Sequence, residues 1–453
     1  MGYRLYEHQE LAIQMMDANP QMGLFMDLGV GKTNVALFWT LRAYKRGEIQ
    51  NALVICPASL VKSWEQAIDG MIAFDGITDK DVETMKRIVT ISSFQKTYHA
   101  QKVKIGTSNG RDVMRRRISL RPEVDRPWGV VFVDESHCIG AHDSVQTKSA
   151  ITLSRLARHR YIMTATPVHG ASGRESFEKL YGQMQFLYQG RMWRNWTEFC
   201  GRYVTSWDRF HKPASWQVQA CRRLMQNHAM VVRKEDCLDL PGFTQTDIAC
   251  ELQETKIYND VRKGDYSKYG ITVESAGGEY TKLLQIVSGS CKLGDGSIMQ
   301  LRTAKDEALR TLLEGTDERM LIFCNYRASI DRVEHICREC GRDPLVYDGR
   351  SKRETWKDFQ DGKGDVLILQ YQSGSAGLNL QTCNICVYWE PCFSALLLEQ
   401  SGGRIYRSGQ DRHCSFYYLV TQGSIEQRVW REVKEGRDVS NKTLVDWAHG
   451  HEF

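Results

Sequence analysis

The chain has 453 residues, of which 42% are hydrophobic and 25% are charged, and its formal net charge is +5. This length and composition predict a soluble globular protein with at least two domains. No apolar run approaches the roughly eighteen residues of a membrane helix, and the N-terminus lacks a signal-peptide core. We therefore expect no membrane partner and a cytoplasmic, reducing location, to which 14 scattered cysteines are suited.

The first element in chain order is an apolar run at residues 23–26, followed by a glycine-rich turn and a helix-like segment at residues 34–44. Glycines such as Gly29 and Gly31 let backbone N–H groups close around phosphates, while Lys32 would reach the terminal phosphates and Thr33 would ligate magnesium. The pattern predicts a phosphate-binding loop. The strict pattern has a glycine where Met26 stands, so a glycine turn that only caps a helix is the alternative.

Further strands are predicted at residues 53–56, 88–91, 130–133 and 161–164. Their alternation with helices indicates a parallel sheet covered on both faces, with ligand groups at the carboxyl ends of the strands. Asp134 and Glu135 follow one of these strands, where Asp134 would hold the metal and Glu135 would orient the attacking water. Taken alone this pair could be a solvated turn. Together with the glycine loop it predicts an enzyme that hydrolyses ATP with Mg²⁺.

Residues 96–126 carry much of the positive charge, with nine Lys or Arg against three Asp or Glu. Asn109 and Gly110 stand between two short alternating runs, which is a hairpin signal. Three consecutive arginines, Arg115, Arg116 and Arg117, follow the turn. A basic hairpin predicts phosphate contacts with nucleic acid, and a solvated charged insertion is the alternative.

The second half repeats the strand–helix alternation, and Pro241-Gly242 marks a junction. The stretch from 251 to 299 reads as mostly helical, with a glycine-rich break at residues 276–278. We therefore predict a first lobe at residues 1–240, a helical insertion or linker at 241–304, and a second lobe at 305–453. The strands expected in the second lobe are residues 320–324, 345–347, 366–370, 385–389 and 415–420.

Two Cys-x-x-Cys pairs have a spacing that suits zinc, Cys337 with Cys340 and Cys383 with Cys386. The first pair lies in a helical pattern at residues 327–340, and the second straddles the start of a strand. These positions favour core cysteines over a metal site.

Near the C-terminus, Arg404 and Arg407 stand three residues apart and would project the same way from a helix. If one lobe holds a nucleotide and arginines of another lobe touch it, hydrolysis is fast only when the lobes close. A surface pair that caps a helix is the alternative.

With these residues in view, the chain resembles the Swi/Snf-type ATPases, the DNA-translocase branch of the superfamily two helicases. The resemblance follows the order of that family's motifs over nearly the whole length. It implies two tandem RecA-like lobes with parallel sheets and short helical insertions. The matching segments are residues 6–9, 29–33, 57–60 with Trp64, 92–94, 134–137, 164–167, 233–234, 240–241, 321–323, 347–349, 375–380, 389–391, 400–410 and 423–426.

The resemblance also implies roles for particular residues. The implied ATP-binding residues are Gln9, which would read the adenine edge, Gly29, Val30, Gly31, Lys32, Thr33 and Gly377. The implied catalytic residues are Lys32, Asp134, Glu135, Gln400, Arg404 and Arg407, with Thr33 and Asp134 at the metal. The implied DNA contacts, beside the three hairpin arginines, are Ser59, Lys62, Ser92, Asn325, Ser375 and Trp389.

The chain departs from the family pattern at a few positions. Met26 and Asp27 replace the usual acidic pair before the loop, Ser136 replaces alanine, and Gly403 stands where an aspartate is common. None of these changes removes a residue expected to contact the phosphates, and both arginines of the implied arginine-finger motif, Arg404 and Arg407, are kept. Because few residues follow Gln410, we expect a near-minimal motor.

The function that the resemblance implies is an ATP-dependent motor that moves on double-stranded DNA without separating its strands. Such a motor would remodel forks or displace bound proteins. Forked or single-stranded DNA are further candidate partners. The alternatives are a strand-separating DNA or RNA helicase of the same superfamily and a non-catalytic nucleic-acid clamp. Lys32, Glu135, Arg404 and Arg407 together argue against the clamp.

Overall fold

The structure is a computed structural model that describes residues 2–108, 111–168, 177–203, 215–237, 240–273, 278–351, 354–374 and 378–439. Two compact units divide the chain close to residues 238 and 239, and we call them the first and second lobes. Among the described residues, no helix is long and apolar enough to cross a bilayer.

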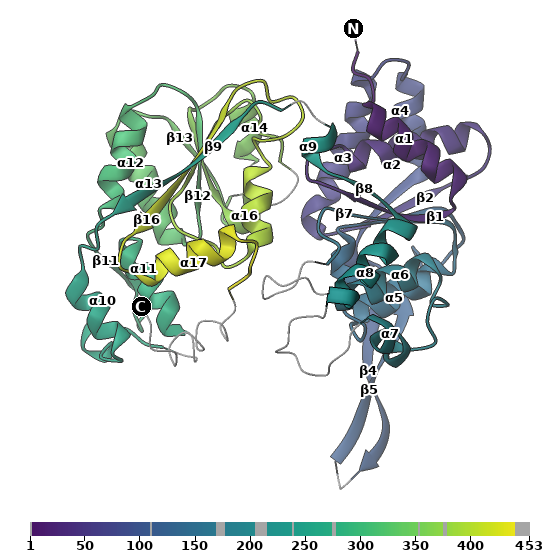
Figure 1. Cartoon of the computed structure of the whole chain (residues 1–453), viewed down its shortest axis with the longest axis horizontal. Helices are drawn as coiled ribbons and strands as arrows, with labels where there is room; N and C mark the ends of the chain where they lie inside the picture. The colour runs from purple at the N-terminus through teal and green to yellow at the C-terminus, as the bar shows by residue number, and fades with distance from the viewer. Residues whose placement is uncertain are drawn as a thin grey trace. The chain divides into compact units, whose positions relative to one another are not determined.

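A six-stranded, fully parallel sheet forms the centre of the first lobe (Figure 1). Its strands are ordered β3-β2-β6-β7-β1-β8. Most of these strands coincide largely with apolar runs of the sequence, as is typical of buried parallel strands. Their bounds are β1 (Gln21–Met26), β2 (Ala52–Cys56), β3 (Val89–Ser93), β6 (Trp128–Asp134), β7 (Ala157–Thr164) and β8 (Ala229–Val232).

Helices cover both faces of this sheet because successive strand side chains point to opposite sides. Val54 and Phe132 pack on one face against α1 to α4, whereas Leu53 and Val131 pack on the other against α5 to α8. The bounds are α1 (Glu7–Ala18), α2 (Lys32–Lys45), α3 (Val61–Gly70), α4 (Asp79–Ile88), α5 (Val145–Ser154), α6 (Leu180–Leu187), α7 (Trp196–Tyr203), α8 (Ser215–His228) and α9 (Lys234–Cys237). Short 3-10 turns lie at Ala58–Leu60, Met71–Ala73, Phe94–Lys96, Ser136–Ile139 and Phe177–Lys179.

The second lobe contains its own six-stranded parallel sheet, ordered β13-β14-β12-β15-β16-β9. Ile322 and Ile368 pack on one face against α12 and α13, and Phe323 and Leu369 pack on the other against α10, α11, α14, α16 and α17. The strands are β9 (Phe243–Cys250), β12 (Met320–Cys324), β13 (Pro344–Tyr347), β14 (Val366–Gln370), β15 (Ile385–Tyr388) and β16 (Cys414–Thr421). The helices are α10 (Thr255–Arg262), α11 (Gly278–Val287), α12 (Lys305–Glu314), α13 (Arg327–Glu339), α14 (Thr355–Gln360), α15 (Tyr371–Gly374), α16 (Ala395–Gly402) and α17 (Ile425–Lys434), with a 3-10 turn at Ser267–Tyr269.

The predicted strands and the two-sheet architecture are confirmed, although the bounds of most strands shift by one to four residues. For example, Ile88 ends α4 and β3 begins at Val89. The segment 241–304 differs from the expected helical linker. It supplies β9, which pairs with β16 over eight residues, and a small hairpin of β10 (Ser290–Lys292) with β11 (Ile298–Gln300). The sequence signal for β9 is weak, because most of its side chains are exposed at the edge of the sheet and need not be apolar.

The basic segment forms a long antiparallel hairpin of β4 (Tyr98–Ser108) and β5 (Arg111–Leu120), which extends away from the sheet of the first lobe (Figure 1). Its predicted turn at Asn109 and Gly110 lies outside the described residues. The register places Lys102 opposite Arg116 and Gln101 opposite Arg117.

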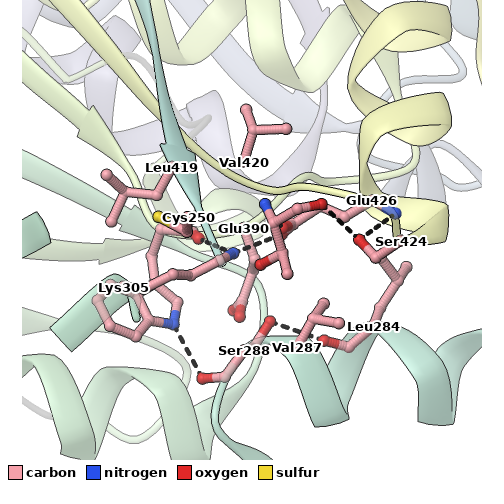
Figure 2. Close-up of polar contacts among 12 residues, drawn as sticks. Cys250, Leu284, Val287, Ser288, Lys305, Glu390, Leu419, Val420, Ser424 and Glu426 are labelled. Carbon is pink, nitrogen blue, oxygen red and sulfur yellow. Dashed lines mark hydrogen bonds and ion pairs between the residues drawn. The ribbon is translucent and has the colours of Figure 1, made fainter. Parts of the chain in front are cut away.

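A buried ion pair joins distant segments of the second lobe (Figure 2). Lys305 Nζ lies 2.5 Å from Glu426 Oε1 and donates to the carbonyl oxygen of Trp389 at 2.6 Å, and both charged side chains are 0% exposed. The other carboxylate oxygen accepts the backbone N–H of Thr421 at 2.8 Å. These contacts tie the starts of α12 and α17 to the end of β15.

Replacing Lys305 with Met should lower the free energy of unfolding of the second lobe by about 3–5 kcal/mol, because Glu426 would stay buried without its cation. Urea unfolding of the full chain measures this loss. Lys363→Met is the matched control, since Lys363 pairs with Asp358 at 2.7 Å while 68% exposed, and an exposed pair contributes about 1 kcal/mol or less. The double variant Lys305→Met with Glu426→Leu should recover most of the stability. Equal losses for Lys305→Met and the control would contradict the prediction.

Candidate active site

The glycine turn between β1 and α2 has the backbone shape that a phosphate-binding loop requires. Gly29 and Gly31 have φ values of 84° and 92°, a region that side-chain-bearing residues rarely adopt. A Cβ on Gly31 would lie 2.0 Å from Nε2 of Gln9. Gly31 therefore serves both the left-handed turn at the start of α2 and the close approach of α1.

Lys32 opens α2 and folds back over the loop. Its Nζ donates to the carbonyl oxygens of Met26 at 2.6 Å and Asp27 at 3.0 Å. The Asp27 carboxylate is engaged elsewhere, because its Oδ2 accepts the backbone N–H of Lys234 at 2.9 Å. Asp27, one of the two residues that depart from the family pattern, therefore links the start of α9 to the end of β1.

Gln9 is buried against the loop. Its Nε2 donates to the carbonyl oxygen of Val30 at 2.9 Å, and its Oε1 accepts the backbone N–H of Tyr6 at 3.1 Å. His8 Nε2 also lies 2.9 Å from the Val30 oxygen. These contacts hold the loop to α1, and the reading of an adenine edge by Gln9 stays a prediction.

Asp134 and Glu135 lie at the carboxyl end of β6, in the same sheet as β1. Glu135 has a left-handed backbone, with φ of 50°. Its Oε2 accepts the hydroxyl of Thr164 at 3.4 Å and lies 3.3 Å from Nδ1 of His137. His137 Nδ1 is also 3.1 Å from the Thr164 hydroxyl oxygen. Glu135 of the acidic pair thus contacts Thr164, the last residue of β7.

Burial and neighbouring charges shift the pKa values of these groups. Burial, followed by the Glu135 charge, raises the pKa of Asp134. Burial would also raise the pKa of Glu135, but His137, Lys32 and Thr164 outweigh it and lower that pKa. Burial would lower the pKa of His137, yet Cys138 and Glu135 raise it to about 9. Glu135 is consequently an ionised carboxylate beside a protonated imidazole at neutral pH.

Ser136, which replaces the family's alanine, connects two segments that sequence analysis left separate. Its hydroxyl donates to Gln183 Oε1 at 2.8 Å, and Gln183 Nε2 donates to the carbonyl oxygens of Pro167 at 2.7 Å and Lys179 at 3.0 Å. Gln183 is 0% exposed. A buried glutamine in the apolar helix α6 was the sequence signal for this link, and it was missed.

The donor set near the loop fits magnesium. Within the described ranges, no group of three or more His, Cys, Asp or Glu side chains is arranged to hold a metal ion. Mg²⁺ in nucleotide sites is commonly held by one or two carboxylates together with substrate phosphates, and not by a protein cage. Each Asp134 oxygen accepts one hydrogen bond, from Trp64 Nε1 at 2.9 Å or from the N–H of Glu135 at 3.0 Å. A carboxylate oxygen has a further lone pair for a metal.

In the second lobe, Arg404 and Arg407 converge on one backbone atom. The Nη1 atoms of both arginines lie 3.3 Å from the carbonyl oxygen of Leu378. The expectation that they project from a helix is wrong, because α16 ends at Gly402 and both residues follow it. Burial lowers the pKa of Arg407. Gln400, the other implied catalytic residue of this lobe, lies within α16.

The predicted DNA contacts differ in how far the structure exposes their side chains. Ser59, Lys62 and Arg117 are exposed, while Ser92 is buried and Asn325 is partly exposed. The DNA contact predicted for Trp389 is wrong for its side chain, which is 0% exposed and donates through Nε1 to Ser288 O. The predictions for Ser375 and Gly377 lie outside the described residues, and so do the side chains of Arg115 and Arg116.

Comparison with known families gives two matches along the chain. Residues 8–293 match the model of the SNF2-related domain, and residues 304–409 match the model of the helicase conserved C-terminal domain. Each match falls largely on one of the two sheets. Together with the observed topology, they confirm the predicted pair of RecA-like lobes.

Several characterised and uncharacterised proteins are similar to the chain. The DNA repair protein rhp54 of Schizosaccharomyces pombe is 22% identical over 93% of this chain and 55% of its own length. The DNA repair and recombination protein RAD54 of Saccharomyces cerevisiae is 22% identical over 89% of this chain and 51% of its own length. An uncharacterized ATP-dependent helicase of Mycoplasma pneumoniae is 22% identical over 96% of this chain and 41% of its own length.

The chain thus spans about half the length of the curated relatives it matches. One solved structure that is similar to the chain is the Sulfolobus solfataricus SWI2/SNF2 ATPase core in complex with dsDNA, and the match covers 99% of this chain and 94% of the solved chain. The sequence identity is 17% and the TM-score is 0.42.

Proposed function

The chain belongs to the SNF2-related family, and on that premise we propose that it is an ATP-dependent motor on double-stranded DNA. The observation that carries the proposal lies in the first lobe. The phosphate-binding turn with Lys32 follows β1, and the acidic pair Asp134 and Glu135 lies at the carboxyl end of β6 in the same parallel sheet. Ligand groups of such sheets gather at the carboxyl ends of the strands.

The chemistry of the first lobe follows from its residues. Backbone N–H groups of residues 29–33 would bind the phosphates of ATP, with Lys32 leaving its contacts to Met26 and Asp27 for the terminal phosphates. Thr33 and Asp134 would hold Mg²⁺, which supplies neutralisation of phosphate charge. Glu135, ionised and accepting a hydrogen bond from Thr164, would orient the attacking water.

The second lobe would complete the site on closure. Arg404 and Arg407 would then exchange their shared contact with Leu378 O for phosphate oxygens, where a guanidinium binds with favourable geometry. Hydrolysis would be fast only in the closed state. Each ATP turned over would drive one cycle of closing and opening along the DNA.

DNA binding would depend mainly on the phosphate backbone, through exposed residues such as Ser59 and Lys62 and through the hairpin β4–β5. The relatives named as DNA repair proteins support DNA as the partner. We propose duplex DNA, with forked DNA as a second candidate substrate. Remodelling of forks or displacement of bound proteins would be the work done by such a motor.

Steady-state ATPase assays with duplex DNA, single-stranded DNA, forked DNA and RNA test the proposal. Duplex DNA should stimulate turnover most strongly, and stimulation should decline steeply with salt. A larger effect of single-stranded DNA or RNA would favour a strand-separating helicase. Turnover that none of the four nucleic acids stimulates would refute the motor.

The basic hairpin makes a separate prediction. Changing Arg115, Arg116 and Arg117 to Ala should weaken duplex binding and reduce the slope of log K against log salt by about one unit per lost phosphate contact. Fluorescence anisotropy over a salt series measures the slope. The control variant changes three exposed cations of α4, Lys80, Lys86 and Arg87, to Ala, which removes the same charge from the same lobe. If both variants change the slope equally, net charge and not the hairpin is responsible.

A further inference from the structure

The indole of Trp64 connects an exposed helix of the first lobe to the acidic pair. Trp64 lies in α3 and is 2% exposed. Its Nε1 donates to Oδ2 of Asp134 at 2.9 Å, across 70 positions of sequence. Asp134 is itself only 7% exposed. A hydrogen bond to a buried carboxylate is among the stronger kinds, and its loss leaves the charged oxygen without a donor.

The two donors to Asp134 fix both oxygens of its carboxylate. Oδ2 accepts the indole N–H, and Oδ1 accepts the backbone N–H of Glu135 at 3.0 Å. The second contact belongs to β6 and the turn after it, so it moves with Asp134. The first comes from a separate helix. The rotamer of Asp134 therefore depends on the position of α3.

Helix α3 also carries an exposed polar face. It begins directly after the 3-10 turn Ala58–Leu60, in which Ser59 is exposed, and Lys62 lies exposed in its first turn. Residues two apart on a helix point in nearly opposite directions. Lys62 consequently faces outward while Trp64 faces Asp134, and about half a turn of helix separates them.

We propose that Trp64 is a positioning residue that links phosphate-backbone contact at Ser59 and Lys62 to the metal-holding carboxylate of Asp134. The inference rests on the proposed function for the identity of both ligands. DNA bound across the first turn of α3 restrains the helix, the helix sets the indole, and the indole N–H sets the carboxylate. The link gives DNA a short route to the metal position that does not pass through the second lobe.

Trp64→Phe tests the first half of the link, because it removes the N–H and keeps an aromatic ring in the core. Mn²⁺ is titrated into full-length protein with ADP, and free Mn²⁺ is followed by its EPR signal. Loss of a group that orients a metal ligand lowers metal affinity about 10- to 100-fold, so the dissociation constant for Mn²⁺ should rise at least about tenfold.

Trp128→Phe is the matched control. Trp128 is also 2% exposed in the first lobe, but its Nε1 donates at 3.0 Å to a backbone carbonyl oxygen, that of Val124. This variant should bind Mn²⁺ as the wild type does. An unchanged constant in Trp64→Phe, or an equal rise in both variants, would overturn the assignment, since the second result would reflect packing and not the hydrogen bond.

The coupling half is read from the ratio of ATPase rates with and without duplex DNA, at saturating Mg²⁺. Trp64→Phe should reduce this ratio several-fold, and Trp128→Phe should preserve it. If DNA stimulates the wild type and Trp64→Phe keeps the same ratio of rates, the proposed coupling is overturned. A wild type without stimulation overturns the proposed function and the coupling with it, whereas the Mn²⁺ titration still decides the contact with Asp134.

Discussion

Replacing Glu135 with Gln is expected to lower kcat for ATP hydrolysis about 10²- to 10⁴-fold. The amide keeps the shape of the side chain but cannot accept a proton from the attacking water. It also loses the charge that pairs with the protonated His137, 3.3 Å away. Because Glu135 does not belong to the phosphate-binding loop, the dissociation constant for ATP should change little. Single-turnover hydrolysis and fluorescent-nucleotide binding measure the two effects separately.

Glu48→Gln serves as the control for this substitution. Glu48 lies in the same lobe, 2.7 Å from Arg46 and 39% exposed, and its amide variant should hydrolyse ATP at the wild-type rate. Turnover by Glu135→Gln within twofold of wild type would refute the assigned role. Lost ATP binding in that variant would instead indicate that Glu135 shapes the nucleotide site.

Replacing Arg407 with Ala should reduce DNA-stimulated ATP hydrolysis about 10³-fold, the lower range for an arginine that stabilises transferring phosphate. Arg407 and Arg404 both donate to the carbonyl oxygen of Leu378, a neutral acceptor that binds a guanidinium more weakly than phosphate oxygens do. ATP affinity of the first lobe should persist. Rates with saturating duplex DNA, compared with nucleotide affinity, measure the difference.

Arg412→Ala is the control for Arg407→Ala. Arg412 follows five residues later, where it pairs with Glu318 at 2.6 Å and donates to Thr382 O at 2.7 Å. It should affect stability slightly and turnover little. Equal loss of rate in both variants would identify a structural effect on residues 378–412 and would exclude a specific role for Arg407.

Sequence patterns located most of the secondary structure of both lobes. Buried parallel strands are continuous apolar runs, and glycines at positive φ mark turns, so β6, β14 and the turn at Gly29 and Gly31 are local signals. The strand β9 lacked such a signal. It is an edge strand with mostly exposed side chains, and only its pairing with β16 makes it a strand.

The order of motifs was also sufficient to identify the family, which the match over residues 8–293 shows. Roles of individual residues depend on more than order. Trp389 illustrates this, because its motif suggested a DNA contact while its side chain fills the core of the second lobe. Tryptophan suits either position, and its neighbours in space decide which one it occupies.

By itself, then, the sequence determined two α/β lobes, the positions of their strands and the residues of a phosphate-binding loop, since each of these depends on neighbours within a few positions. Only the tertiary structure decided which distant polar groups meet: Trp64 with Asp134, Ser136 with Gln183, and Lys305 with Glu426. These partners stand 70, 47 and 121 positions apart. Their pairing follows from the order of strands in each sheet and from the requirement that buried polar groups find partners, and neither is encoded in any local pattern.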